Sequence, residues 1–301
     1  MILGIDVGAT WTRTILAEES GKIVKSQKFR TTTDPVRTAV EVSENWDYDS
    51  IGVGTIGPLD LKGGRVVGSA NAPSKNFSIA DPLLKTGKPF YIANDGVSAA
   101  WGEYTYKWND VKNLVYITFS TGIGAGAIVD GNLLLGKDGN AHEIGYIVVD
   151  LSSGVFCCGG TGYWEGIASG GHMVDSFKEL AGRWGEPKEQ PVQAADIFRL
   201  ASEGDKVAEG FLDYWLEVNA AGLASISVSY DPEVIVIGGS VALNNWDFFY
   251  EGVTKKIKGH VRVREPTIEK ATFGDDEVAI GAIALVHNPP VSLKQFGYPR
   301  K

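Results

Sequence analysis

The sequence predicts an α/β protein of two domains. Its 301 residues exceed the length at which a single hydrophobic core is usual. Two short segments, 4–12 and 116–126, each join an apolar strand to a glycine-rich turn that carries hydroxyl side chains. The same pattern therefore begins again more than a hundred residues along the chain, which is typical of an internal structural repeat.

The first domain is expected to open with an antiparallel meander, because short apolar strands alternate there with turn residues. Asn94-Asp95-Gly96 then separates an apolar strand from a helix. The expected strands are 2–7, 12–18, 23–29, 50–55 and 89–93, and the expected helices are 35–45 and 97–104.

The second domain is expected to repeat the strand–turn–strand opening and then to become helical. Its strands are predicted at 114–119, 126–129, 133–135 and 233–237, and its helices at 164–182, 192–202, 205–229 and 276–287. We place the boundary near 105–112, which gives an N-terminal domain of 1–108 and a C-terminal domain of 109–301. The helix at 276–287 is expected to pack back on the first domain, and the proline-containing tail after it is expected to be extended.

The composition limits the partners of the protein. A net charge of −9 argues against nonspecific binding to nucleic acid or to acidic membranes. No run approaches the roughly 18 to 20 apolar residues of a membrane span, and the sequence enters a strand at its N-terminus, so we expect a cytoplasmic location. Two adjacent cysteines, Cys157 and Cys158, cannot form a disulfide framework, which fits a reducing compartment.

Both glycine-rich turns predict phosphate-binding loops. Glycines and small hydroxyl residues let backbone N–H groups approach a phosphate closely. The first turn adds Asp6, whose carboxylate can hold a metal ion beside that phosphate. Taken alone, each turn is also explained as a hairpin in a glycine-rich sheet. The two turns together, with Gly238-Gly239 closing a third strand, favour one nucleotide held between two domains.

Asp95 is the candidate general base. It follows an apolar strand and precedes a helix, so its carboxylate lies at the end of a sheet strand. There it can accept the proton of a substrate hydroxyl that attacks phosphorus. The alternative is structural, because Asn and Asp at such a position routinely cap the N-terminus of a helix. The two phosphate-type turns favour the catalytic interpretation.

Together these segments resemble the ROK branch of the superfamily of sugar kinases, actin and heat-shock ATPases. The first turn is similar to the first phosphate motif of the family, with Ala9 where the family usually has glycine. The resemblance also covers the second phosphate motif, the adenosine motif, the Gly-Pro segment, the Asn-Asp helix and two sugar-contact stretches. These segments are, in that order, 118–126, 234–240, 54–60, 94–103, 142–145 and 162–165.

The resemblance implies two ribonuclease-H-like, actin-like ATPase domains that close over a central cleft. It also implies transfer of the γ-phosphoryl group of ATP, with Mg²⁺, to the 6-hydroxyl of a hexose or N-acetylhexosamine, with Asp95 as the base. The residues implied in sugar binding are Gly57, Asn71, Asn94, Asp95, Glu143, Tyr146 and Glu165. Those implied in ATP binding are Asp6 (also the Mg²⁺ ligand), Gly8, Ala9, Thr10, Thr12, Ser120, Thr121, Gly122, Gly238 and Gly239.

The chain departs from the family at its structural zinc site, which typically has one histidine and three cysteines. Here those positions hold Tyr146, Phe156, Cys158 and Tyr163. One thiolate cannot hold a tetrahedral zinc ion, and Cys157 would point elsewhere in an extended chain, so we expect no structural zinc. Aromatic packing by Phe156, Tyr163 and Trp164 is expected to replace the metal. The phenol of Tyr146 is expected to take over the sugar contact of the missing histidine.

Two other functions are considered beside the kinase. A sugar-responsive ROK repressor would carry an N-terminal helix-turn-helix, whereas this sequence begins at the first phosphate strand, and its acidic charge opposes DNA binding. An ATP-switched scaffold would need no sugar-binding carboxylates. The sequence leaves glucose, N-acetylglucosamine and N-acetylmannosamine open, although the small Ala70 mildly favours an N-acetyl group. The family resemblance implies a homo-oligomer, either a dimer or a tetramer.

Overall fold

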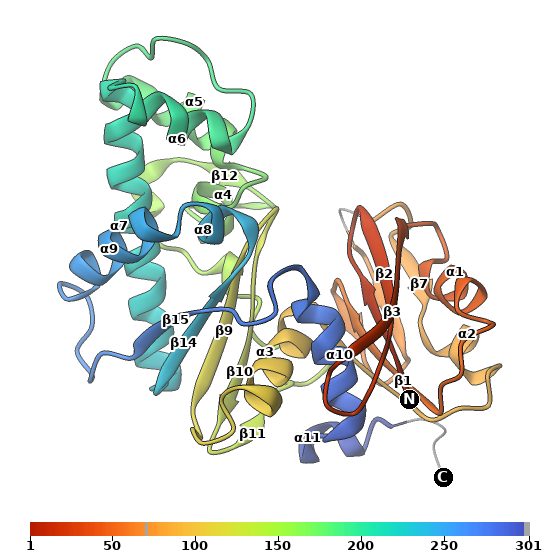
Figure 1. Cartoon of the computed structure of the whole chain (residues 1–301). Coiled ribbons are helices and arrows are strands. Elements are labelled where there is room, and N and C mark those ends of the chain that lie inside the picture. Colours follow the sequence, from red (N-terminus) through yellow and green to blue (C-terminus); the bar gives the residue numbers. More distant parts are fainter. Residues whose placement is uncertain (70–71, 298–301) are drawn as a thin grey trace. The chain divides into compact units, whose positions relative to one another are not determined.

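The computed structural model describes residues 1–69 and 72–297 (Figure 1). The chain divides into two compact units, neither of which is continuous in sequence. The first unit comprises Met1–Tyr116, Ala125–His142 and Ala271–Lys301, and the second comprises Ile117–Gly124 and Glu143–Lys270. The C-terminal segment therefore belongs to the same unit as the N-terminus.

A five-stranded sheet of order β3-β2-β1-β4-β8 forms the centre of the first unit. β1, β2 and β3 form an antiparallel meander, and β1, β4 and β8 run parallel. These strands are Ile2–Val7 (β1), Trp11–Ala17 (β2), Ile23–Arg30 (β3), Ser50–Thr55 (β4) and Phe90–Asn94 (β8). Almost every residue of β1 and β4 is buried, which explains their nearly continuous runs of apolar residues and glycines. The edge strand β3 is exposed and carries Lys25, Lys28 and Arg30.

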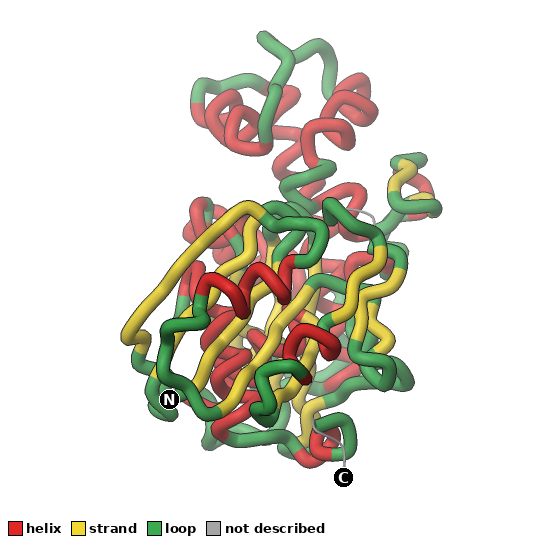
Figure 2. The backbone as a smooth tube through the Cα atoms, turned by 90° about the vertical axis from the view of Figure 1, so that its right-hand side faces the viewer, coloured by secondary structure: helices red, strands yellow, loops and turns green. Residues whose placement is uncertain are grey.

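Helices cover both faces of this sheet. α1 (Pro35–Val42) and α2 (Ala80–Leu84) lie on the face that Figure 2 turns toward the viewer. α3 (Asp95–Tyr106) and α10 (Glu277–His287) pack together against the other face. The approach of α10 requires glycine in the sheet, because a Cβ atom at Gly52 would lie only 1.8 Å from a carbonyl oxygen of the helix.

A second five-stranded sheet has the order β11-β10-β9-β14-β15. Its strands are Leu114–Phe119 (β9), Ile123–Val129 (β10), Asn132–Leu133 (β11), Val234–Gly238 (β14) and Thr267–Lys270 (β15). In both sheets the first strand is central, the next two follow on one side, and the later strands lie on the other. The predicted internal repeat is therefore confirmed as a repeat of topology.

The second unit is rich in helices. Its longest helix, α7 (Lys206–Tyr230), begins where the side chain of Asp205 accepts two backbone hydrogen bonds. Trp164, Trp215 and Phe249 are fully buried in the core of the second unit. The other elements are α4 (Trp164–Ala168), α5 (Met173–Leu180), α6 (Ala194–Ser202), α8 (Ser240–Asn244), α9 (Trp246–Ile257) and the hairpin strands β12 (Phe156–Cys157) and β13 (Gly160–Thr161). Among all helices of residues 1–69 and 72–297, none is both long and apolar enough to cross a bilayer.

Several elements differ from the sequence-based expectation. The helix predicted at 164–182 is interrupted after α4, where Ser169 is followed by two glycines. The tail predicted to be extended contains α11 (Val291–Lys294). The sequence does not predict α9 or β15. It also does not predict the short α2 or the three strands of a small sheet, because segments of so few residues show little periodicity. Those three strands are β5 (Leu59–Asp60), β6 (Arg65–Val67) and β7 (Asn76–Ser78).

Candidate functional site

Three parallel strands of the first unit end side by side, and predicted site residues follow each of them. Val7 of β1 pairs with Thr55 of β4, and Thr55 pairs with Asn94 of β8. In sheets with parallel strands, ligands bind outside the carboxyl ends of the strands. The loop after β1, Gly57 and Asp95 therefore emerge at one edge of the sheet, whereas Asn71 lies outside the described residues.

The loop after β1 is held by threonine hydroxyls. The Thr31 hydroxyl donates to the carbonyl oxygen of Gly8 at 2.7 Å, and it also meets the Thr12 hydroxyl at 2.9 Å. Thr12 is fully buried, whereas Thr10 is exposed. The part of this loop that is open to a phosphate is therefore Gly8–Thr10, and Thr12 supports the loop through its contact with Thr31.

The sequence suggests two roles at this position, a helix cap and a general base, and the structure distinguishes Asn94 from Asp95. Asn94 is the N-cap of α3, and its side-chain oxygen accepts a hydrogen bond from the Gly96 N–H at 3.0 Å. Asp95 is the first residue of the helix, and its Oδ1 accepts from the same N–H at 2.8 Å. The capping alternative thus applies to Asn94, while the carboxylate of Asp95 is oriented by the start of the helix.

Asp6 and Asp95 influence each other electrostatically. Burial, and next to it the negative charge of Asp95, raises the pKa of Asp6 to about 7. The oxygens of two such carboxylates are ligands that a hard cation prefers, and a bound cation would stabilise the ionised form of both groups. The donor set therefore fits the Mg²⁺ ion that the family resemblance implies.

In the second unit, the hairpin between β9 and β10 carries the second phosphate-type loop. The Ser120 N–H donates to the Gly122 carbonyl oxygen at 2.9 Å and closes the turn. The N–H groups of Gly170 and Gly171 donate to the carbonyl oxygens of Ser120 and Thr121, at 2.7 and 3.0 Å. The glycine pair after α4 thus fixes the loop, a role that sequence reasoning missed although two adjacent glycines were visible there.

A cavity of about 370 Å³ lies next to this loop within the second unit. Its lining combines hydroxyl and amide side chains with apolar side chains and comes from four parts of the chain. The lining residues are Ser120, Thr121, Gly170, Gly171, Gln193, Ala194, Ala195, Phe198, Ser240, Val241, Asn244 and Asn245. This mixture suits a nucleoside, which has an apolar ring face and polar edges. Sequence reasoning missed the residues from α6 and the two asparagines.

The predicted adenosine motif forms the connection from β14 to α8. Gly239 has a φ of 84°, and a Cβ atom there would lie 2.3 Å from the carbonyl oxygen of Phe119. Glycine is therefore required for this connection to run directly beside the strand that leads into the second loop. Gly238 and Gly239 shape the turn, and Ser240 and Val241, which follow them, line the cavity.

The structure brings the predicted sugar-contact residues of the second unit together. Glu165, near the start of α4, accepts a hydrogen bond from the Ile123 N–H through its Oε2 at 2.8 Å. Burial raises the pKa of Tyr146 to about 12, and the negative charges of Glu165 and Glu143 act in the same direction. Tyr146 is therefore a neutral phenol near two carboxylates, and 47% of its surface remains exposed.

The expected aromatic replacement of the zinc site is only partly correct. Trp164 is fully buried, and its indole N–H donates to Asn219 at 2.8 Å. Tyr163 packs edge-on against Tyr146, with ring centroids 5.5 Å apart. Phe156 does not take part, because 68% of its surface is exposed at the hairpin of β12 and β13.

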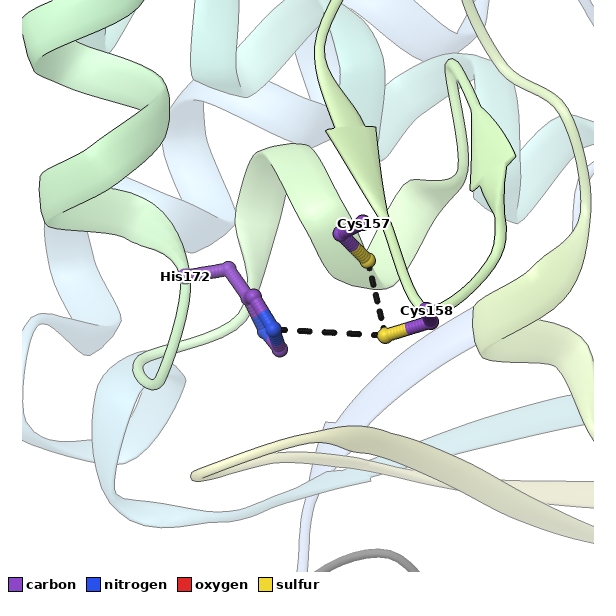
Figure 3. A group of neighbouring side chains, drawn as sticks. All are labelled: Cys157, Cys158 and His172. Carbon is purple, nitrogen blue, oxygen red and sulfur yellow. Dashed lines mark hydrogen bonds between the residues drawn. The ribbon is translucent and has the colours of Figure 1, made fainter.

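The expectation that Cys158 stands apart from Cys157 is wrong (Figure 3). Their Sγ atoms lie 2.8 Å apart, and His172 Nε2 lies 3.9 Å from Cys158 Sγ. The chain is not extended at this point but turns, since Cys158 has a φ of 55°. Sequence reasoning missed His172, because it is separated from the cysteines by the whole of α4.

The fold is that of an α/β protein of the actin-like ATPase class, as predicted. The sequence model of the ROK family matches residues 2–289, and the chain belongs to this family. It is 50% identical over 299 residues to a glucokinase of Pyrobaculum calidifontis, with 99% of each chain covered. It is 36% identical over 318 residues to a glucokinase of Aeropyrum pernix, with 98% of this chain and 99% of that relative covered.

Solved structures agree with this assignment. One is the ROK family glucokinase from Streptomyces griseus, in complex with glucose and AMPPNP. It superimposes with a TM-score of 0.76 at 28% sequence identity, and the match covers 94% of this chain and 98% of that chain.

Proposed function

We propose that the protein is an ATP-dependent sugar kinase that phosphorylates the 6-hydroxyl of glucose. The observation that carries this proposal is the placement of Asp95, which follows β8 at the edge where β1 and β4 also end. A carboxylate base beside a phosphate-type loop suits phosphoryl transfer to a hydroxyl oxygen. The two glucokinase relatives and the glucose and AMPPNP of the Streptomyces griseus complex support the same activity.

In the proposed reaction, the Asp95 carboxylate accepts the proton of the sugar O6. The bond from O6 to the γ-phosphorus forms while the bond from that phosphorus to the β–γ bridging oxygen breaks, and ADP leaves. The hydrogen bond from the Gly96 N–H holds Oδ1 of Asp95, which fixes the direction of the carboxylate. Orientation of this kind supplies much of the catalysis in phosphoryl transfer.

We assign ATP binding to both loops. The cavity of the second unit would hold the nucleoside, with Ser120 and Thr121 directed to the phosphates. Gly8–Thr10 would offer backbone N–H groups to the phosphates. Asp6 would hold Mg²⁺, which neutralises developing charge on the phosphate oxygens when it is bound.

We assign sugar recognition to three side chains that accept hydrogen bonds and one that donates a hydrogen bond. Asn94, Glu143 and Glu165 would accept hydrogen bonds from sugar hydroxyls, since carboxylates and amides read such donors geometrically. Tyr146 would donate its phenol proton, which its raised pKa retains at neutral pH. Glucose is our first choice because both relatives reported above are glucokinases, and the N-acetylhexosamines are the competing candidates.

The test is ADP release in a coupled assay with ATP, Mg²⁺ and a sugar panel. We expect release with glucose that exceeds release with N-acetylglucosamine, N-acetylmannosamine or no sugar, and a product whose phosphate is on O6 by phosphorus NMR. ADP release at the same rate without sugar would instead define an ATPase. A preference for an N-acetylhexosamine would keep the kinase and contradict the choice of glucose.

A further inference from the structure

The tip of the β12–β13 hairpin lies against the segment after α4 and gathers two thiols and an imidazole (Figure 3). The ligand atoms of Cys157, Cys158 and His172 all lie within 4.8 Å of one another. Cys157 is buried, whereas Cys158 is exposed and reaches solvent. The cluster therefore has both a protected side and an entry path.

The backbone of the hairpin holds the two thiols on the same side. Cys157 pairs with Gly160, so Cys158 and Gly159 form a two-residue turn. Both have positive φ values, 55° and 92°, as the tightest β-hairpins require. Positive φ is uncommon for a residue other than glycine, asparagine or aspartate, and here it brings the Cys158 side chain back toward Cys157.

The imidazole is oriented as in a metal ligand. Nδ1 of His172 meets the hydroxyl of Ser169 at 3.2 Å, so Nε2 is the nitrogen that faces Cys158. A hydrogen bond at the far ring nitrogen is the usual way in which proteins fix a ligating histidine. Glu165 adds a fourth donor, because its Oε1 lies 3.7 Å from Cys158 Sγ while its Oε2 is held by a backbone N–H.

We propose that Cys157, Cys158 and His172, with Glu165 as the fourth ligand, form an exchangeable site for a thiophilic divalent metal ion such as Zn²⁺. Two sulfurs, one nitrogen and one oxygen are a donor set that zinc accepts. Only Cys158 occupies a position that the family uses for structural zinc, so the site is a different one. Exposure of Cys158 at the tip of a short hairpin makes the ion exchangeable.

A small movement of Cys158 would bring two of the distances between ligand atoms to those of a zinc site. With bonds of about 2.3 Å to sulfur and 2.0 Å to nitrogen, a tetrahedral site needs about 3.8 Å between its sulfurs and about 3.5 Å between sulfur and nitrogen. The present separations are 2.8 Å between the sulfurs and 3.9 Å from Cys158 Sγ to His172 Nε2. Moving Cys158 Sγ away from Cys157 and toward His172 corrects both distances.

The test is a titration of untagged protein, reduced with a phosphine and freed of metal, with Co²⁺ in the absence of sugar. We expect a thiolate-to-cobalt charge-transfer band that saturates at one equivalent and that Zn²⁺ abolishes by displacement. His172→Gln should weaken Co²⁺ binding by at least about tenfold, because the loss of a residue that merely supports a ligand already costs about that much. Cys158→Ser should remove most of the band, and its circular dichroism should match that of the parent protein.

His260→Gln is the matched control, since His260 is exposed and pairs with Glu217 at 2.7 Å. This variant should keep the full band and affinity. Absence of a saturable band, or the same affinity in the His172→Gln variant, would overturn the proposal. An intact mass lower by two hydrogens despite the phosphine would also overturn it, because the thiols would then form a disulfide.

Glu165 couples this metal site to the proposed sugar site, and this step rests on the proposed function. Glucose that occupies Glu165 should weaken Co²⁺ binding by at least about tenfold, and Zn²⁺ should raise the KM for glucose. Unchanged Co²⁺ affinity at saturating glucose would contradict the coupling. The titration without sugar would still decide the metal site separately, so the two failures are distinguishable.

Discussion

The start of a helix orients the carboxylate of Asp95, the proposed general base. Asn94 caps α3, and the Asp95 carboxylate accepts the Gly96 N–H. Asp95→Asn keeps this acceptor but loses the basic oxygen, so turnover should fall by roughly 10² to 10⁴ while sugar and ATP binding change little. Steady-state kinetics and calorimetry measure the two effects. Asp47→Asn, an exposed control, should be silent, and turnover of the Asp95 variant within tenfold of the parent would contradict its role as base.

The proposed role of Asp6, in contrast to that of Asp95, is to bind Mg²⁺. Burial raises the pKa of its carboxyl to about 7, and the charge of Asp95 acts in the same direction, so a cation beside the two groups would stabilise their ionised forms. Asp6→Ala should therefore lower Mg²⁺-dependent turnover on the order of 10² to 10³ and raise the Mg²⁺ concentration that is needed. Glucose affinity, measured by calorimetry without nucleotide, should stay within a few-fold. Loss of glucose binding with normal turnover would show that the loop after β1 has another function.

At the scale of elements, α6 forms one wall of the cavity in the second unit. Ala195 lines this cavity and is exposed. Ala195→Trp places a large side chain in a space of about 370 Å³ and should raise the KM for ATP at least about tenfold by excluding the nucleoside, without a comparable change for glucose. Ser202→Trp, on the same helix but outside the lining, is the control. Equal ATP affinity in both variants would show that the nucleoside binds elsewhere.

The contact between α3 and α10 contains two buried carboxyl groups. Glu103 accepts a hydrogen bond from the Thr272 hydroxyl at 2.8 Å, and Glu277 accepts from the Phe273 N–H at 2.5 Å. Burial, and next to it the charge of Glu103, raises the pKa of Glu277 to about 9. The folded chain therefore retains a proton that the unfolded chain loses, so this pair contributes less stability as the pH rises from about 4.3 toward 9.

Glu277→Gln should flatten this pH dependence, because the amide carries hydrogen at every pH. Between pH 6 and pH 9, the free energy of unfolding should fall by at least about 1.4 kcal/mol less in the variant than in the parent. Chemical denaturation at both pH values measures the difference. Glu41→Gln, an exposed carboxylate on α1, should behave like the parent. Parallel curves for the parent and the Glu277 variant would mean that the pair is ionised throughout.

At the scale of the whole molecule, the sequence predicts the buried strands best. β1, β4 and β9 have the predicted bounds, because each is a continuous apolar run closed by glycine or polar residues. The break between α4 and α5 was missed, since apolar residues continue across the glycine pair with helical spacing. The small sheet of β5, β6 and β7 was missed because its strands have only two or three residues.

The sequence likewise predicts some residues of the candidate site and misses others. Asp6, Asp95 and the loop at Ser120 are visible in the sequence because a strand, a turn and a chemical group occur together there. Phe198, Asn244 and Asn245 line the cavity, yet no local pattern marks them. His172 likewise meets the cysteines only through the fold, and the turn at Cys158 requires a positive φ that sequence periodicity does not reveal.

Stability of the whole molecule should not depend on a structural metal. Its cores are built from large apolar side chains, such as the fully buried Trp164 and Trp215, and the thiol cluster lies at the tip of a short hairpin. Exhaustive chelation should leave the Tm within about 2 °C, since a loss of 1 kcal/mol would already shift it by about 2–4 °C in a chain of this size. Activity should return fully with Mg²⁺ alone. A melting point that drops by tens of degrees and recovers only with Zn²⁺ would make the cluster a structural site, because metals that hold a fold together contribute folding free energy directly.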